Sequence, residues 1–92
     1  MIKSFRHPGV ERFFRTGSLA GIQAKHANKL RLQLFALNNS KHPSDMNAAG
    51  WKLRPLKGKL TGPRAVWVSG DWRLTFAFED EYAVLVDYQD YH

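Results

Sequence analysis

The sequence has no cysteine among its 92 residues. This excludes a disulfide framework, a cysteine zinc finger and a thiol nucleophile. No apolar run approaches the roughly 20 residues that a helix needs to cross a bilayer. Residues 1–6 also lack the apolar core of a secretory signal. We therefore expect a small cytoplasmic protein without a membrane partner.

Acidic residues are scarce over most of the chain. All fourteen Lys and Arg but only three acids lie in residues 1–78, which gives this part a net charge of +11. The other five acids lie in residues 79–92, and the whole chain carries +6. A strongly basic body indicates a polyanionic partner, most often a nucleic acid. The alternative is a solvated basic surface without a partner.

Length and composition predict one domain that spans residues 1–92. A second core would need roughly 50 more residues. Hydrophobic residues make up 43% and charged residues 24% of the chain, which is ordinary for a globular protein.

Two helices are predicted near the N-terminus. Pro8 suits the first turn of a short helix, which has an aromatic face and ends at Gly17. A second helix is expected to begin at Ser18 or Gly21 and to end near residues 38–39. Its apolar stripe consists of Ile22, Ala27, Leu30, Leu34 and Leu37. Leu32 and Phe35 widen this stripe, so we expect the helix to pack on more than one side.

The second half of the sequence is typical of strands. After a loop over residues 40–50, with one helical turn after Ser44, strands are predicted at 51–56, 64–68, 72–79 and 82–88. Pro55 favours an edge position for the first of them. Residues 1–5 also alternate and form a possible short strand. The third strand places Trp72, Leu74, Phe76 and Phe78 on one face, and Arg73, Thr75 and Ala77 on the other.

This element order predicts an α+β fold. We expect the two N-terminal helices to pack on one face of a mostly antiparallel, curved sheet of four to five strands. Arg73 and Thr75 then point to the uncovered face, where a basic sheet can hold single-stranded nucleic acid.

Most catalytic signatures are missing. Residues 56–59 lack the spacing of a phosphate-binding loop, and there is no Gly-x-Ser-x-Gly elbow. The four histidines have no metal-ligand spacing, so neither a metal nor another cofactor is expected. Two patterns remain: four bases within residues 52–59, and a C-terminal run of Tyr, Asp and His over residues 87–92. Taken alone, the basic run is explained as a solvated loop and the C-terminal run as a polar tail.

Together these patterns suit one chemistry. RNA is cleaved when its own 2′-hydroxyl attacks the adjacent phosphate, which requires a base, an acid and cations that stabilise the phosphorane. His, Tyr, Asp, Lys and Arg supply all of these without a metal.

Segments that match one known family occur along the whole chain. The matching segments are residues 1–5 with His7 and Gly9, 52–53, 55–58, 71–73 with 75–76, and 90–92. With these segments the chain resembles the HigB toxins of the host-inhibition-of-growth toxin–antitoxin systems, within the RelE superfamily. The resemblance implies a compact RelE-like domain and a ribosome-dependent endoribonuclease that cleaves mRNA in the A site of the 70S ribosome. It also implies a HigA-type helix-turn-helix antitoxin, through which alone the toxin contacts operator DNA.

The resemblance also implies roles for individual residues. Lys57 and Arg73 would bind and neutralise the scissile phosphate. Tyr91 and His92 would take acid–base or base-stacking roles, with Asp90 orienting them. The further RNA-binding candidates are Lys52, Arg54, Lys59 and Arg64.

Physical chemistry leaves the general base open. The α-carboxylate beside His92 favours the imidazolium form, which suits an acid better than a base. Lys57 or Tyr91 could act as base only if neighbouring cations favour loss of the proton.

Two other functions compete with this interpretation. The first is a non-catalytic module that grips RNA or the ribosome and blocks translation by occupancy, in which case the terminal Tyr91-His92 pair would not matter. The second is a DNA-binding regulator, which we disfavour because no helix-turn-helix pair fits.

Overall fold

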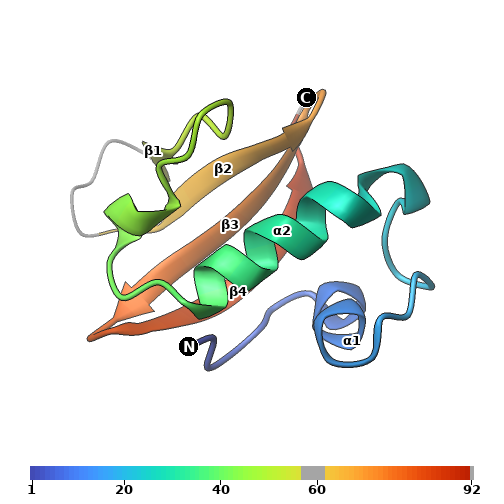
Figure 1. The fold of residues 1–92 in the computed structure, drawn as a ribbon, viewed down its shortest axis with the longest axis horizontal. Coiled ribbons are helices and arrows are strands. Elements are labelled where there is room, and N and C mark those ends of the chain that lie inside the picture. Colours follow the sequence, from blue (N-terminus) through green and yellow to red (C-terminus); the bar gives the residue numbers. More distant parts are fainter. Residues whose placement is uncertain (57–61, 92) are drawn as a thin grey trace.

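The computed structural model describes residues 1–56 and 62–91. Its strands form one open sheet in the order β1-β2-β3-β4, with every neighbouring pair antiparallel. The strands are β1 (Arg54–Pro55), β2 (Arg64–Ser69), β3 (Trp72–Glu79) and β4 (Tyr82–Asp90). The helix α2 (Ala27–Asn38) crosses one face of the sheet, and α1 (Pro8–Thr16) lies beside it, toward the β4 edge (Figure 1). The predicted α+β arrangement is confirmed.

The helix α1 has the boundaries that the sequence predicts. Pro8 occupies its first turn, and the His7 side chain caps it, since the Val10 N–H donates to His7 Nδ1 at 3.0 Å. Gly17 ends the helix in the left-handed conformation, with φ of 81°. The Gly17 N–H donates to the carbonyl oxygen of Phe13 at 2.8 Å, which satisfies one of the last carbonyls of the helix.

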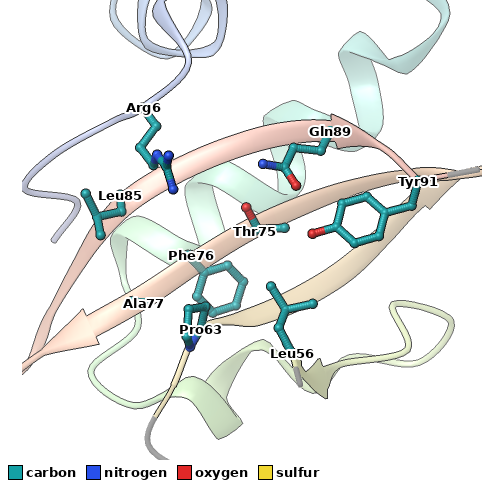
Figure 2. A pocket seen from close by; sticks show the side chains of 9 residues that line it. All are labelled: Arg6, Leu56, Pro63, Thr75, Phe76, Ala77, Leu85, Gln89 and Tyr91. Atoms are coloured by element: carbon teal, nitrogen blue, oxygen red, sulfur yellow. The ribbon is translucent and has the colours of Figure 1, made fainter. Parts of the chain in front are cut away.

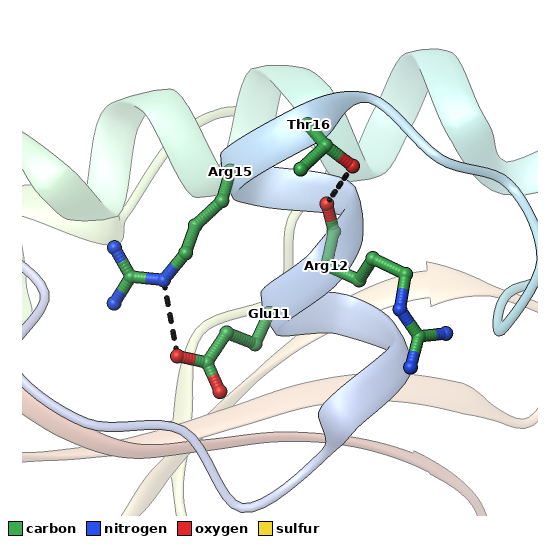
Figure 3. Close-up of polar contacts among 4 residues, drawn as sticks. All are labelled: Glu11, Arg12, Arg15 and Thr16. Carbon is green, nitrogen blue, oxygen red and sulfur yellow. Dashed lines mark hydrogen bonds and ion pairs between the residues drawn. The ribbon is translucent and has the colours of Figure 1, made fainter.

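The outer face of α1 is polar. Glu11 and Arg15 form an ion pair one turn apart, with Oε2 and Nε 3.0 Å from each other (Figure 3). Thr16 Oγ1 donates to the Arg12 carbonyl oxygen at 2.8 Å. Both contacts are exposed, so they contribute little to stability beyond solvating this side of the helix.

The prediction that the second helix begins at Ser18 or Gly21 is wrong. A 3-10 turn over Ala24–His26 leads into α2, which begins at Ala27 and ends at Asn38. The reason is a close contact between backbones: a Cβ built on Gly9 would lie 2.5 Å from the Gly21 carbonyl oxygen. This contact holds the segment before α2 against the start of α1, where it cannot join a helix.

The packing of α2 is one-sided. The buried residues of its stripe are Ala27, Leu30, Leu34 and Leu37, as predicted. Leu32 and Phe35 remain 62% and 70% exposed, so the expected packing on a second side is not found. Neither α1 nor α2 has the length and apolar character required to span a membrane, and the same holds for every helix of the described residues.

The first predicted strand is much shorter than expected. Only Arg54 and Pro55 pair with β2, rather than residues 51–56. Lys52 has a left-handed backbone (φ 53°), and Pro55 has no N–H to continue a ladder. The edge position predicted from Pro55 is confirmed. The helical turn in the preceding loop is a 3-10 helix over Pro43–Met46.

The N-terminal segment lies along β4 without forming a full strand. Ile2 and Phe5 make isolated parallel bridges to Ala83 and Val86. The Ile2 N–H also donates to Asn38 Oδ1 at 2.9 Å, which ties this segment to the end of α2.

The two hairpins fall where the sequence predicts them, but β4 contains a bulge. Thr75 pairs with Asp87 and Ala77 pairs with Val84, so β4 uses one residue more than β3 between these pairs. Leu85 lies at this bulge with φ of 56° and is half exposed.

The core between the sheet and α2 contains Val66, Leu74, Phe76, Val86, Tyr88, Leu30 and Leu34.

Candidate functional site

The strand register places polar residues on the face of the sheet opposite α2. One cross-strand row consists of Arg54, Ala65, Thr75 and Asp87. A second row consists of Trp67, Arg73 and Gln89. Directly paired residues share a face of the sheet, so the prediction that Arg73 and Thr75 point to this face is confirmed, although Thr75 is itself buried.

A pocket of about 350 Å³ lies on this face. We call it the open-face pocket. It is lined by Arg6, Leu56, Pro63, Thr75, Phe76, Ala77, Leu85, Gln89 and Tyr91. Figure 2 views the pocket with α2 behind the sheet, and the Tyr91 hydroxyl is directed toward the middle of the pocket.

The backbone holds Tyr91 at the pocket. Its N–H donates to the Asp71 carbonyl oxygen at 2.8 Å, which fixes the chain just after β4 beside the β2–β3 turn. The side chain is 37% exposed, so a bound ligand can reach both the ring and the hydroxyl. A phenol in this position can donate a proton, accept one or stack on a base.

Arg73 does not line the open-face pocket, but it pairs with Gln89, which does, so the register places it at the rim of the pocket. Its Nη1 donates to the carbonyl oxygens of Gly70 and Trp72, both at 3.1 Å. These bonds hold the guanidinium at the end of the β2–β3 hairpin while using only one of its nitrogens. Within the described residues no carboxylate pairs with it, so its charge remains available to an anion.

The side chain of Gln89 is held by a neighbouring carboxylate. Gln89 Nε2 donates to Asp87 Oδ2 at 2.6 Å, and Asp87 Oδ1 accepts the Tyr88 N–H at 2.8 Å. Because Asp87 holds the amide nitrogen of Gln89, the amide oxygen has a fixed direction and can accept a hydrogen bond from a ligand.

Two polar residues of the pocket, Arg6 and Gln89, are not among those predicted from the sequence. Gln89 could have been found by extending the β4 alternation from Asp87 to Tyr91. Arg6 had no such signal, because it reaches the pocket only through the bridge between Phe5 and Val86 and the bond from its own N–H to the Val86 carbonyl (2.8 Å).

Asp90 is not brought together with Tyr91. It pairs with Trp72, whose ring stacks on Tyr88 with centroids 4.4 Å apart, so the register places Asp90 on the helix side. Its charge is one cause of the raised pKa of Tyr88, after burial. His92, the other member of the terminal pair, lies outside the described residues, so the orienting role of Asp90 stays a prediction.

The remaining candidates are scattered around the sheet. Arg54 shares the face of the open-face pocket, while Arg64 pairs with Phe76 and its Nη1 donates to the Gly62 carbonyl oxygen at 2.8 Å. Lys52 is exposed, with its ammonium 4.7 Å from the ring centroid of Trp67. Lys57, Lys59 and His92 lie outside the described residues.

Behind the sheet, a buried pair of ring side chains supports β4. His26 Nδ1 and the Tyr88 hydroxyl are hydrogen-bonded at 2.5 Å. Burial, helped by the charge of Lys25, lowers the pKa of His26. Burial raises the pKa of Tyr88, although a bond from the Gln23 backbone acts in the opposite direction. Both groups therefore stay neutral near pH 7, which suits a structural pair beneath the strand that carries Gln89.

The described residues contain no group of three or more His, Asp or Glu that could hold a metal ion. What the pocket offers is an arginine in its lining, a second arginine at its rim, and hydroxyl and amide groups between them. This arrangement can bind a phosphodiester and transfer a proton close to it.

Comparison with known proteins identifies the family. Residues 3–92 match the model of the HigB-like toxins, described as "RelE-like toxin of type II toxin-antitoxin system HigB". The chain is also 35% identical to a protein of Proteus vulgaris named Endoribonuclease HigB, with the full length of both chains covered. The chain therefore belongs to the HigB-like family of RelE-like toxins from type II toxin–antitoxin systems.

Proposed function

We propose that this chain is a ribosome-dependent endoribonuclease that cleaves mRNA in the A site and so inhibits translation in the cytoplasm. The observation that carries the proposal is the open-face pocket, where the Tyr91 hydroxyl and the Arg6 guanidinium share one cavity with Arg73 at its rim. The relative named Endoribonuclease HigB supports the same activity.

The reaction proceeds by proton transfer around a phosphate. The 2′-hydroxyl of the substrate loses its proton to a base, and the new bond from O2′ to phosphorus displaces the 5′ oxygen. An acid protonates this leaving oxygen, so the products are a 2′,3′-cyclic phosphate and a 5′-hydroxyl end. Charge that accumulates on the phosphorane requires cations at the equatorial oxygens.

The side chains of the pocket fit these tasks. Arg73 binds the scissile phosphate, and Arg6 provides a second guanidinium from the opposite side of the Thr75 row. Tyr91 acts in proton transfer or stacks on a base. As the family resemblance implies, Lys57 keeps the role of a phosphate ligand and His92 an acid–base or base-stacking role. The identity of the base stays unassigned.

The partners follow from the family. We propose the 70S ribosome with its mRNA as the substrate complex, because a pocket with few titrating groups gains most from a substrate that the ribosome already orients. A HigA-type helix-turn-helix antitoxin neutralises the toxin and carries it to operator DNA.

The test is induction of the chain in a bacterial host, followed by mapping of mRNA 5′ ends. We expect growth arrest and new ends inside translated codons. Tyr91→Ala should lower cleavage by about 100-fold, the usual contribution of one acid–base group. Tyr82→Ala is the matched control, because Tyr82 is a similarly exposed tyrosine (42%) that does not line the pocket. Arrest without new ends, unchanged in Tyr91→Ala, would instead identify an inhibitor that acts by occupancy.

A further inference from the structure

A pair of lysines lies against one tryptophan outside the open-face pocket. The ammonium of Lys29, from α2, is 4.8 Å from the ring centroid of Trp67, and that of Lys52 is 4.7 Å from the same centroid. Lys29 is half-buried and Lys52 is exposed. A cation at this distance from an indole is attracted by the electron-rich ring, so the ring gathers two positive charges at the edge of β2. We call these three residues the Trp67 cluster.

The structure fixes the indole in place. Trp67 Nε1 donates to the Gly70 carbonyl oxygen at 2.8 Å, and the Trp67 N–H donates to the Trp51 carbonyl oxygen at 2.7 Å. The Trp67 carbonyl oxygen accepts a bond from Gln33 Nε2 at 2.8 Å. The indole is therefore a fixed surface for both ammonium groups, which lie 4.8 and 4.7 Å from its centroid.

No acid neutralises the Trp67 cluster within the described residues. The only ion pair found there joins Glu11 and Arg15 on α1. Arg73 adds a third charge, because its Nη1 donates to the same Gly70 oxygen as Trp67 Nε1. Three cations that converge without a carboxylate form a ready site for an anion with several charges.

The Trp67 cluster is continuous with the open-face pocket. Trp67 pairs with Arg73, which pairs with Gln89, and Gln89 lines the pocket. Neighbouring strands lie about 4.8 Å apart, so the row covers roughly 10 Å from Trp67 to Gln89. An extended strand of RNA with one phosphate at the pocket therefore reaches the cluster with a nearby phosphate.

We propose that the Trp67 cluster binds the phosphodiester backbone of RNA outside the reacting nucleotides. The cluster gives affinity and direction to the bound strand and takes no part in proton transfer. This inference rests on the proposed function, because it takes the open-face pocket as the place where the RNA is cleaved. The phosphates can belong to the mRNA strand or to ribosomal RNA, which share this chemistry.

The experiment compares Lys29→Gln and Lys52→Gln with Lys3→Gln in the full chain. Lys3 is the matched control, since its ammonium also lies over a ring, that of Tyr82, at 5.0 Å from the centroid and far from the row. Binding is measured to a short single-stranded RNA and, separately, to purified 70S ribosomes, over a range of salt concentrations. Thermal unfolding of each variant checks that the fold is kept.

We expect Lys29→Gln and Lys52→Gln each to weaken binding several-fold and to reduce the salt slope by about 0.7 for a single strand. Lys3→Gln should bind like the wild type. Effects seen with the short RNA assign the cluster to the mRNA strand, and effects confined to ribosomes assign it to ribosomal RNA. The inference is overturned if both cluster variants bind as Lys3→Gln does in both assays.

Binding is read without turnover, so it separates this inference from the proposed function. A wild-type chain that binds RNA through Lys29 and Lys52 but makes no new mRNA ends would contradict the nuclease proposal and leave the cluster standing. A chain that cleaves mRNA while both cluster variants bind normally would support the nuclease proposal and contradict the role of the Trp67 cluster.

Discussion

His26 and Tyr88 are 62 positions apart in the sequence, and their side chains meet in one buried hydrogen bond. His26 is only 3% exposed, and its pKa is lowered from 6.5 because burial penalises the imidazolium, with Lys25 adding to the effect. In the neutral imidazole the donor and acceptor of this bond depend on the tautomer, whereas a protonated ring can only donate at Nδ1. The turn that leads into α2 and the last part of β4 are therefore joined by a bond whose donor and acceptor depend on pH.

This bond predicts an acid-sensitive fold. Below pH 6.5 the unfolded chain binds a proton at His26 that the folded chain resists, so the free energy of unfolding falls as the pH drops. The loss begins near pH 6.5, has a slope of at most ~1.4 kcal/mol per pH unit, and ends at the lowered pKa of the folded state. Urea unfolding between pH 5 and pH 7.5 measures the slope.

His26→Gln should flatten this part of the stability profile, because glutamine offers an acceptor to Tyr88 without titrating. His42→Gln, at an exposed position, should leave the profile as it is. An unchanged slope in His26→Gln would show that another group carries the acid sensitivity.

Arg73 is predicted to matter for cleavage and little for stability. Its guanidinium donates hydrogen bonds to two carbonyl oxygens at the β2–β3 hairpin and lies at the rim of the open-face pocket. Arg73→Gln should lower kcat/KM for mRNA cleavage on ribosomes by about 100-fold, as for the loss of one donor to a developing oxyanion. Its Tm should stay close to that of the wild type. Arg12→Gln, an exposed change on α1, controls for loss of charge, and equal activity of the two variants would remove Arg73 from the site.

Local patterns predicted the elements that carry the open-face pocket. Strict alternation in β3 placed Arg73 and Thr75 on the uncovered face, and the glycine and acidic turn residues marked both hairpins. These features depend only on neighbouring residues, so the sequence reports them directly. The same holds for Gly17, which ends α1 because its left-handed φ is accessible to glycine.

The rest of the site depends on contacts between distant parts of the chain. Arg6 enters the pocket because Phe5 bridges to Val86, and no local pattern reports such a bridge. Lys52 was already an RNA-binding candidate and Lys29 was not, and only the folded chain shows that both reach Trp67. The start of α2 was misplaced for a similar reason, since a backbone contact across two segments overrides the helical pattern there.

That backbone contact gives a stability prediction for two glycines. A Cβ on Gly9 would come within 2.5 Å of the Gly21 backbone, so Gly9→Ala must separate the two segments and should cost roughly 1–3 kcal/mol or more. Gly17→Ala meets no atom within 4 Å and suffers only its left-handed φ, a cost of about 1 kcal/mol. Chemical denaturation ranks the two variants, and a larger loss in Gly17→Ala would contradict the role assigned to the contact.

Two adjacent residues of α2 provide the last prediction. Leu34 is 1% exposed and packs between the helix and the sheet, while Phe35 is 70% exposed on the outer side. Leu34→Ala leaves a cavity and should lower the free energy of unfolding by about 2–5 kcal/mol. Phe35→Ala removes a larger side chain but little buried surface, so its effect should stay within about 0.5 kcal/mol.

The comparison of Leu34 and Phe35 tests the placement of α2 directly, because a rotation of the helix by one residue would exchange their environments. Urea titrations of both variants, with the same slope assumed for unfolding, give the two values. If Phe35→Ala proves the more destabilising change, α2 packs on a second side after all, and the assignment of its buried stripe is wrong.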